Sequence, residues 1–328
     1  MTVVVDIKRV GTYYKNADRT ATPGGLPNFL NEDKRLYGVL RFEMDLKKGC
    51  ENFKDEGYGD VFVSFFDYIK KTNKQGTPLK EAINADFISN RRILMIFAES
   101  PYFHNRSTTI KAVRKNGVIF LREQKTEGAE LNPYGCGFKF EQNMTLNSNK
   151  EPFDENEPVS NADCSKSVMR TTLTKEEEKI RVFYTAEMDA IDQQGNYVEI
   201  NTTKAPYHLW LKFQSLHHYL QSYLGSVAYI VRGQIDEDKI VKRVDRTWTH
   251  TIPKKVEEAI QQDPRWKGKK WNTNDCMEKL FEVLQNIKNE LRYDDDAIMI
   301  HVRGNDIDYE EADNRNVVDD PRFLEYFE

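Results

Sequence analysis

The sequence predicts a sheet protein of the α/β or α+β class, because three observations agree. Short apolar runs rich in β-branched and aromatic residues alternate along the chain with segments of helical periodicity. Aromatic residues make up 12% of the 328 residues, which favours a folded core although charged residues reach 31%. Neither a repeat of fixed period nor a clean linker interrupts the chain, so we expect one continuous domain over residues 1–328.

The predicted strands are apolar runs bounded by turn residues. Asn116-Gly117 marks a turn before one of them, and residues 192–196 form the turn between two others. The opening residues have the composition of a first strand. We expect strands at 1–8, 91–98, 117–122, 137–144, 181–190, 196–202, 226–234, 239–245 and 297–302.

Helical spacing of apolar residues predicts the remaining elements. The clearest helix covers residues 207–224, where leucines and a phenylalanine recur at helical spacing and Gly225 ends the pattern. Residues 145–168 are polar enough for an exposed loop. We expect further helices at 60–71, 254–262 and 274–291, and an acidic, partly loose C-terminal tail over 306–328.

Composition and cysteine spacing narrow the class of protein. No window approaches the roughly 18–20 apolar residues of a membrane-spanning helix, and the first residues lack the apolar core of a secretory signal. The four cysteines form no CxxC pair, so we expect reduced thiols, no thiolate zinc site, and a cytoplasmic or nuclear protein. The net charge of −5 does not exclude a nucleic-acid partner, because phosphate binding needs only local basic groups.

Acidic residues lie within the two strands predicted at 181–190 and 196–202. Side chains alternate along a strand, so Glu187 and Asp189 share one face, and Glu199 and Asn201 share a face of the next strand. Because a short turn makes the strands neighbours, three carboxylates can converge, which is unfavourable unless a cation neutralises them. Oxygen ligands of this kind suit Mg²⁺ or Mn²⁺. The alternative is an exposed sheet face on which solvated acids have no ligand.

An Asp followed on the adjoining strand by Glu-x-Lys is the working core of many metal-dependent nucleases. The acids there hold one or two ions, and the lysine positions or deprotonates the attacking water. In this chain Asn201 stands where the lysine is expected, and it carries no charge. Lys204 is a poor substitute, because it would face the other way if the strand continued.

Several short motifs together resemble the DXO/Rai (Dom-three-like) family of RNA 5′-end decapping and exonuclease enzymes. The motifs come in the family's order, with plausible spacing, over roughly residues 10–245. They are Asp45-Leu-Lys-Lys-Gly49, Arg91 before a segment ending Ser-Pro-Tyr102, Gly137-Phe-Lys-Phe-Glu141, Glu187-Met-Asp189, Glu199-Ile-Asn201 and Gln221-Ser-Tyr-Leu224.

The resemblance implies an α+β fold of two mixed β-sheets with flanking helices and a PD-(D/E)xK nuclease-like core. It implies hydrolysis at an RNA 5′ end: removal of a triphosphate or of an incomplete or NAD-type cap, with 5′–3′ exonuclease activity as a further option. It also implies a monomer, and a 5′–3′ exonuclease as protein partner. By family role, the ligands of two Mg²⁺ or Mn²⁺ ions would be Glu141, Glu187, Asp189, Glu199 and the main-chain carbonyl of Ile200.

The same resemblance assigns Arg91 and Gln221 to the terminal phosphates or first nucleotides. A guanidinium offers a planar fork suited to phosphate oxygens. On residue type alone, Arg91 is equally a surface ion-pair partner, Glu141 a solvated residue beside Lys139, and Gln221 an exposed helix residue.

Two departures from the family pattern keep alternatives open. Asn201 in place of the lysine allows a binder of RNA 5′ ends with weakened catalysis, or a protein that acts through an exonuclease partner. His217-His218 occupy the stretch where a lysine-aromatic pair is expected. A histidine there can contact phosphate near neutral pH, or one of the pair can pack against the sheet while the other faces water.

Overall fold

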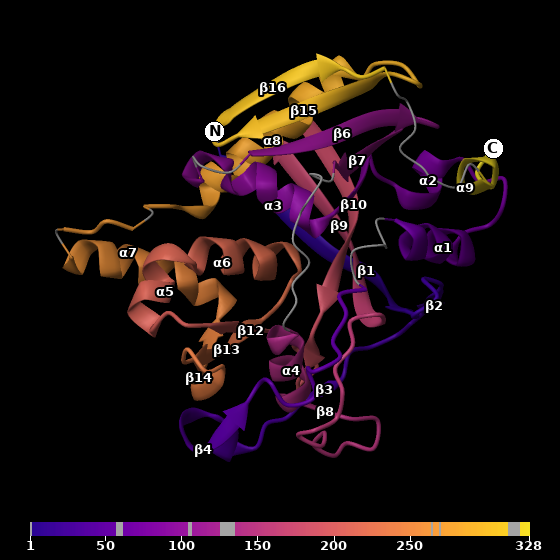
Figure 1. The fold of residues 1–328 in the computed structure, drawn as a ribbon. Helices are drawn as coiled ribbons and strands as arrows, with labels where there is room; N and C mark the ends of the chain where they lie inside the picture. Colours follow the sequence, from indigo (N-terminus) through magenta and orange to yellow (C-terminus); the bar gives the residue numbers. More distant parts are fainter. Residues whose placement is uncertain are drawn as a thin grey trace.

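The computed structural model describes residues 2–56, 62–103, 107–124, 135–263, 265–268, 270–313 and 322–328. Within these ranges the strands form two mixed sheets, and helices cover both (Figure 1). The α+β fold with two mixed sheets is therefore confirmed. The single-domain boundary of 1–328 stays a prediction.

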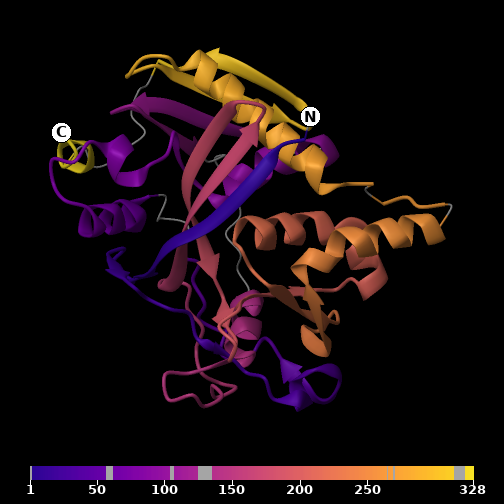
Figure 2. The same ribbon diagram turned by 180° about the vertical axis from the view of Figure 1, so that it is seen from behind.

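The larger sheet has nine strands in the described residues and is antiparallel except at its centre, where β5 pairs in parallel with β7 and β10. Figure 2 shows β1 lying beside the β9–β10 pair. The order is β16 (Asp306–Glu311), β15 (Ala297–Arg303), β6 (Ser107–Lys115), β7 (Val118–Glu123), β5 (Phe87–Asn90), β10 (Glu178–Met188), β9 (Cys164–Lys175), β1 (Val4–Lys15) and β2 (Ala21–Pro23).

The smaller sheet has seven strands in the same ranges, two of its pairings being parallel. Its order is β4 (Gly38–Asp45), β14 (Ile240–Trp248), β13 (Tyr229–Ile235), β12 (Tyr197–Thr203), β11 (Ala190–Ile191), β3 (Phe29–Leu30) and β8 (Thr145–Leu146).

The helices divide the apolar core into three clusters. The largest joins the nine-stranded sheet to α3 (Arg91–Glu99), α6 (Ser215–Leu224) and α8 (Thr273–Glu290), with contributions from α5 (Tyr207–Phe213) and α7 (Ile252–Gln262). The second holds α1 (Val63–Thr72), α2 (Leu79–Ile83) and α9 (Arg322–Glu325), and the third joins α4 (Cys136–Asn143) to the seven-stranded sheet. Short 3₁₀ turns complete the elements at Lys34–Leu36, Ser100–Tyr102 and Thr249–Thr251.

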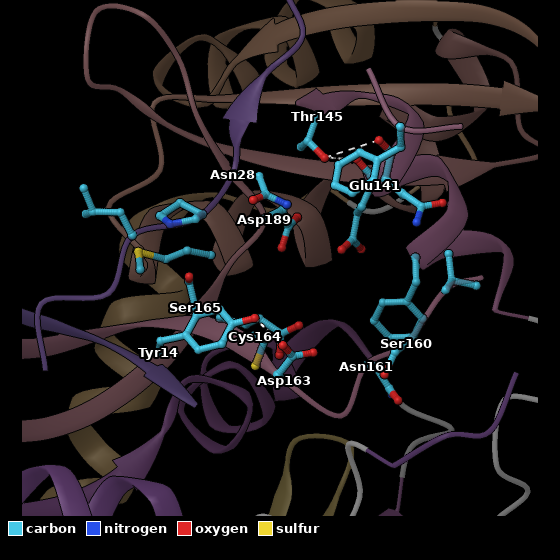
Figure 3. Close-up of a pocket in the computed structure, with 18 of the residues that line it drawn as sticks. Tyr14, Asn28, Glu141, Thr145, Ser160, Asn161, Asp163, Cys164, Ser165 and Asp189 are labelled. Carbon is cyan, nitrogen blue, oxygen red and sulfur yellow. Dashed lines mark hydrogen bonds between the residues drawn. The ribbon is translucent and has the colours of Figure 1, made fainter. Parts of the chain in front are cut away.

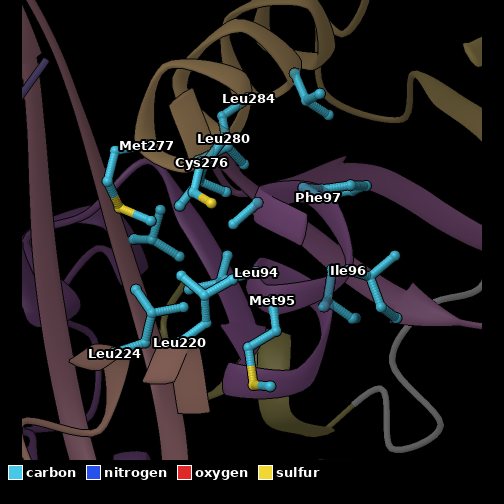
Figure 4. Packing of buried hydrophobic residues seen from close by; sticks show 14 of the residues in the cluster. Leu94, Met95, Ile96, Phe97, Leu220, Leu224, Cys276, Met277, Leu280 and Leu284 are labelled. Atoms are coloured by element: carbon cyan, nitrogen blue, oxygen red, sulfur yellow. The ribbon is translucent and has the colours of Figure 1, made fainter. Parts of the chain in front are cut away.

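Leucines at the meeting of α3, α6 and α8 fix the position of α3, the helix that begins with Arg91 (Figure 4). Leu94, Leu220, Leu280 and Leu284 are essentially inaccessible to solvent. Each such side chain contributes about 1.5–3 kcal/mol through burial. A phosphate-binding candidate at the start of α3 is therefore held by the best-packed part of the molecule.

Two predicted strands are helices. Residues 91–98 lie in α3, where Asn90 Oδ1 accepts a hydrogen bond of 3.0 Å from the Ile93 amide and starts the helix. Its residues 93–98 form an uninterrupted apolar run, all of them buried, and a short run of this kind resembles a buried strand. Residues 137–144 lie in α4, where Phe140 and Met144 are both buried, four residues apart.

Other predicted helices, strands and loops have different boundaries in the structure. The helix expected over 207–224 is two helices, α5 and α6, which meet at Gln214. The segment 145–168 expected as a loop contains β8 and the start of β9 at Cys164. The strand expected over 181–190 ends at Met188, and β11 begins two residues later in the other sheet.

The described parts of the C-terminal segment, which was expected to be acidic and partly loose, contain a strand and a short helix. β16 pairs with β15 over six residue pairs, and Phe323 of α9 is fully buried against Phe66 and Phe120. Residues 314–321 of the predicted tail lie outside the described residues. The remaining predicted elements are present, with shifted ends.

Two observations bear on the predicted class. Cys50, Cys136, Cys164 and Cys276 are all free thiols, as expected. Across the residues that the structure describes, no helix has both the length and the apolar character to cross a membrane.

Candidate functional site

The predicted acidic residues meet where the two sheets join. Glu187 lies near the end of β10 in the nine-stranded sheet, and Asp189 is the single residue between β10 and β11. Glu199 lies in β12 of the seven-stranded sheet. The expectation that all three share one sheet face is therefore wrong, because the chain passes from one sheet to the other at Asp189. The carboxylates converge across the seam instead.

A cavity of about 390 Å³ opens at this seam. Glu141 of α4, Glu187 and Asp189 line it. Figure 3 shows the Glu141 and Asp189 side chains directed into the same space, with Asn28 beside Asp189. Its far wall carries Tyr14 and Asp163, whose side chains are hydrogen-bonded to each other. The site is thus a polar cavity with the three predicted carboxylates on one side and Asp163 on the other.

Asp189 is fixed by the backbone of the neighbouring strand. Its Oδ2 accepts a hydrogen bond of 2.7 Å from the Ile200 amide. Ile200 is the residue whose carbonyl was predicted as a metal ligand, and it follows Glu199 directly. One hydrogen bond therefore holds the linker between the sheets against the strand that carries the third carboxylate.

Glu199 is buried, with 4% of its surface exposed, and two predicted substrate-binding residues hold its carboxylate. Gln221 of α6 donates to Oε1, and Arg91 Nη1 lies 3.4 Å from Oε2. Arg91 Nη1 also donates to the Gln221 carbonyl at 3.1 Å. The structure thus brings Arg91, Gln221 and Glu199 together from a helix start, a second helix and a strand.

The environment at the seam disfavours the ionised form of the carboxylates. Burial, followed by the charges of the neighbouring carboxylates, raises the pKa of Glu141 and of Asp189 well above the ordinary range. Burial also raises the pKa of Glu199, while Arg91 opposes the rise. Acids held this way either bind protons or need a cation beside them.

The donor set fits a hard divalent cation, because it consists of carboxylate oxygens next to a main-chain carbonyl. Among the described residues, however, no three carboxylate, imidazole or thiol groups already meet in an arrangement that holds an ion. The carboxylates are close enough to shift one another's pKa, but they do not surround one common position as metal ligands do. Glu141, Glu187, Asp189 and Glu199 are the side chains that would hold the ion.

The comparisons with known proteins agree with this geometry. The model of the RAI1-like PD-(D/E)XK nuclease family matches residues 4–323. The chain belongs to this family. Decapping nuclease dom-3 of Caenorhabditis elegans is 29% identical over 315 residues, which cover 90% of this chain and 76% of that protein.

Two solved Rai1 structures from yeasts share the fold. Candida albicans Rai1 in complex with pU5-Mn²⁺ superposes with a TM-score of 0.76 at 17% identity, covering 99% of this chain and 96% of that one. Scheffersomyces stipitis Rai1 in complex with (3′-NADP)⁺ and a calcium ion gives 0.76 at 15% identity, covering 99% and 97%. At these identities the likeness shows the fold alone.

Asn201 is the residue that the sequence comparison expected in place of a motif lysine, and this correspondence stays a prediction. Asn201 lies on β12, two residues after Glu199. Among the residues that the structure describes, neither polar atom of its buried side-chain amide has a hydrogen-bond partner. A buried amide in this state costs free energy.

The two histidines on α6 have different environments. His218 Nδ1 accepts a hydrogen bond of 2.7 Å from Trp210 Nε1, and burial lowers the pKa of His218 to about 3. His218 is therefore neutral at any ordinary pH and cannot bind phosphate as a cation. His217 Nδ1 lies 3.0 Å from Oε2 of the fully buried Glu99, and 36% of the His217 side chain is exposed. The expected pair of one histidine against the sheet and one facing water is met only in part, because His218 contacts Trp210 of α5 and the partly exposed His217 pairs with Glu99.

Sequence reasoning missed one charged neighbour of the site, Lys166. It lies on β9 directly opposite Glu187, and its Nζ is 3.5 Å from Glu187 Oε2. The signal that could have revealed it is the charged segment 175–178, which contains the turn of the β9–β10 hairpin. Counting back from the pair Lys175–Glu178 places Lys166 opposite Glu187.

Proposed function

We propose that this chain is a divalent-metal-dependent hydrolase that acts on the 5′ end of RNA. The observation that carries the proposal is the cluster of Glu141, Asp189 and Glu199, whose pKa values are raised by burial at the seam of a nuclease fold. Such a cluster costs stability unless a cation completes it. Arg91 beside the same cluster supplies a guanidinium that suits a terminal phosphate.

Hydrolysis adds water across a phosphorus–oxygen bond: the water oxygen bonds to phosphorus, and the departing oxygen takes up a proton. A bound metal ion supplies an acidified water and neutralises charge on the phosphate oxygens. Gln221 keeps the Glu199 carboxylate oriented through its amide. Arg91 contacts Glu199 through Nη1, at the long distance of 3.4 Å. The Nε and Nη2 donors of the same guanidinium can engage phosphate oxygens.

Finer points of the proposal rest on the motif match. We propose two ions, Mg²⁺ or Mn²⁺, with Ile200 contributing its carbonyl. A monomeric state, a 5′–3′ exonuclease partner and a cytoplasmic or nuclear location stay predictions. The relatives' names support decapping: dom-3 of Caenorhabditis elegans is named a decapping nuclease. The preferred 5′ end is the property that an assay has to decide.

The test uses purified full-length protein with Mg²⁺ or Mn²⁺ and three 5′-labelled RNAs: a 5′-triphosphate, an NAD-capped and an unmethylated-cap RNA. We expect release of the 5′ group from at least one of them, and no release in EDTA. The matched control is Glu199→Gln, which removes one charge at nearly constant volume. Absence of product from all three RNAs, with Mn²⁺ binding intact by calorimetry, would contradict the proposal.

A second candidate function is an RNA 5′-end binder with weakened catalysis. Asn201 favours it, because the amide lacks the charge of the family's lysine and has no hydrogen-bond partner among the described residues. On this reading Asn201→Lys raises turnover about 10²–10³-fold, the usual value of one preorganised electrostatic group. Equal turnover of wild type and Asn201→Lys would exclude this second function.

A further inference from the structure

Residues 153–161, here called the wall loop, supply a wall of the same cavity that holds the carboxylates. The loop belongs to the stretch between β8 and β9. Its cavity-lining members are Phe153, Glu157, Val159, Ser160 and Asn161. Figure 3 shows Ser160 and Asn161 across the open space from Asp189. A 5′ group bound at the carboxylates therefore lies against the wall loop, and the position of this loop sets the room that the group has.

Lys139 of α4 joins the wall loop to the helix that carries Glu141. Lys139 has no exposed surface, and its Nζ donates to the Glu157 carbonyl at 3.0 Å and to Gln142 Oε1 at 2.8 Å. Gln142 Nε2 donates in turn to the Pro158 carbonyl at 3.3 Å. A buried amine is stable only where acceptors satisfy its donors. The wall loop supplies one of these acceptors, so the loop is tied to α4 through Lys139.

A third segment, the turn that ends the motif Asp45-Leu-Lys-Lys-Gly49, meets the same contact. Gly49 has a φ of +75°, and its carbonyl accepts a hydrogen bond of 3.2 Å from the Val159 amide. A Cβ at Gly49 would lie 2.3 Å from the Glu157 carbonyl oxygen and 3.1 Å from Lys139 Nζ. Only glycine fits this close approach with this backbone conformation. The motif therefore supports the wall loop, although it lies outside the carboxylate cluster.

Helix α4 itself is held in place by a different set of contacts. Phe140 is fully buried, and a Cβ at Gly233 of β13 would lie 2.6 Å from its ring. The ring thus packs directly on the backbone of the seven-stranded sheet, and Met144 is buried in the same apolar cluster. The apolar side of α4 places Glu141, whereas Lys139 places the wall loop. Loss of the Lys139 contacts should leave the metal ligand where it is.

We infer that Lys139 is a positioning residue, which together with Gly49 holds the wall loop at the distance from the carboxylates that the 5′ group of the RNA requires. This inference rests on the proposed hydrolysis in the same cavity. Neither residue is among the described residues that line the cavity, so its effect on the substrate passes through the loop. The wall loop contacts the 5′ group before and during the reaction alike, and loss of such uniform binding raises KM without lowering kcat.

Lys139→Met and Gly49→Ala test the inference from two different segments, in steady-state kinetics on each RNA that the wild type cleaves. In both variants KM should rise about five- to tenfold while kcat stays within about threefold. Affinity for Mn²⁺, measured by calorimetry, should stay within about twofold, because the apolar contacts of α4 are intact.

Lys48→Met is the matched control. Lys48 also joins the turn to the wall loop, since its Nζ lies 2.8 Å from Glu155 Oε2, but the two side chains are 41% and 64% exposed. An exposed ion pair of this kind contributes little. The KM of Lys48→Met should therefore equal that of wild type.

Hydrogen exchange followed by mass spectrometry gives a readout that needs no turnover. The Val159 amide is bonded to Gly49, so peptides of the wall loop should exchange about tenfold faster in Lys139→Met and Gly49→Ala than in wild type. Peptides of α4 should exchange at the wild-type rate in both variants. Lys48→Met should match wild type throughout.

Wild-type KM in both variants overturns the inference. A loss of Mn²⁺ affinity in parallel with the rise in KM also overturns it, because Lys139 would then only stabilise α4. An equal rise of KM in Lys48→Met would assign the effect to surface charge instead. If the wild type releases nothing from any RNA, the proposed hydrolysis fails, and unchanged exchange of the wall loop in both variants then overturns the positioning role separately.

Discussion

Asp189 Oδ2 accepts a 2.7 Å hydrogen bond from the Ile200 amide, and this contact holds the residue that links the two sheets against β12 of the smaller one. Asp189 separates β10 of the larger sheet from β11 of the smaller one. The same carboxylate therefore holds the backbone through Oδ2 and also shares a side-chain hydrogen bond with Glu199. A substitution that keeps the acceptor oxygen and removes the charge separates the structural role from the electrostatic one.

Asp189→Asn should keep the contact to Ile200, because the amide oxygen can accept the same hydrogen bond, but it removes a buried charge. We expect kcat to fall about 10²–10³-fold and the metal-free protein to melt about 1–3 °C higher, since mutual repulsion of the carboxylates is relieved. Calorimetric Mn²⁺ titration and thermal melts in EDTA measure both effects. A lower melting temperature in EDTA would show that the charge itself stabilises the seam.

The raised pKa values of Glu141 and Asp189 predict how metal-free stability depends on pH. A folded-state pKa above the unfolded value means that the native state binds more protons between the two values. The stabilisation is complete below the ordinary carboxyl pKa and is lost as pH rises toward the raised pKa. In EDTA, the melting temperature of wild type should therefore fall relative to that of Glu141→Gln as the pH rises from 5 to 8.

In saturating Mg²⁺ or Mn²⁺, the melting temperature of wild type should no longer fall with pH relative to that of Glu141→Gln. The reason is that the metal then stabilises the ionised carboxylates of the wild type. The comparison with the variant matters, since other groups titrate over the same range. A wild-type melting temperature that rises faster than that of Glu141→Gln from pH 5 to pH 8 would contradict the raised pKa.

The gathering of acidic side chains could be predicted from the sequence, but the geometry that brings them together could not. Period-two alternation places Glu187 and Asp189 on one face only if the strand continues, and it ends at Met188. The acids converge because two sheets meet there, which depends on long-range strand pairing that a local pattern does not encode. Glu141 and Arg91 were assigned by family motif, although both lie on helices that the local pattern predicted as strands.

Lys166 shows a different limit of sequence reasoning. The charged segment Lys175–Glu178 contains none of the glycine or asparagine signals of a hairpin turn, so β9 and its register stayed hidden. Helix α3 was mistaken because its apolar residues 93–98 form an uninterrupted run of strand length, which periodicity alone cannot distinguish from a buried strand. In both cases tertiary contacts decide what the local sequence leaves ambiguous.

Arg91 and Arg92 offer a matched pair for testing phosphate binding. Arg91 is 9% exposed and faces Glu199, whereas the exposed Arg92 pairs with Glu123 at 2.7 Å. Arg91→Gln should weaken binding of 5′-phosphorylated RNA about 10–100-fold, and Arg92→Gln should leave it within about twofold. Anisotropy titrations in Ca²⁺ measure both. Equal effects of the two substitutions would assign the binding to general surface charge.

His218 should give stability a pH dependence opposite to that of the carboxylates. Its folded pKa of about 3 lies below the ordinary value, so the unfolded chain binds the extra proton as pH falls below about 6.5. The stabilisation from neutral His218 is complete above that pH and is lost on acidification, by at most about 1.4 kcal/mol per pH unit.

His218→Gln isolates this contribution. The glutamine oxygen can still accept the Trp210 Nε1 hydrogen bond, but the side chain does not titrate. We expect wild type to lose more melting temperature than His218→Gln between pH 7 and pH 5, while kcat at pH 7 changes less than threefold because the neutral ring lies away from the carboxylates. Parallel melting profiles for the two proteins would mean that His218 is protonated as readily in the folded state as in the unfolded chain.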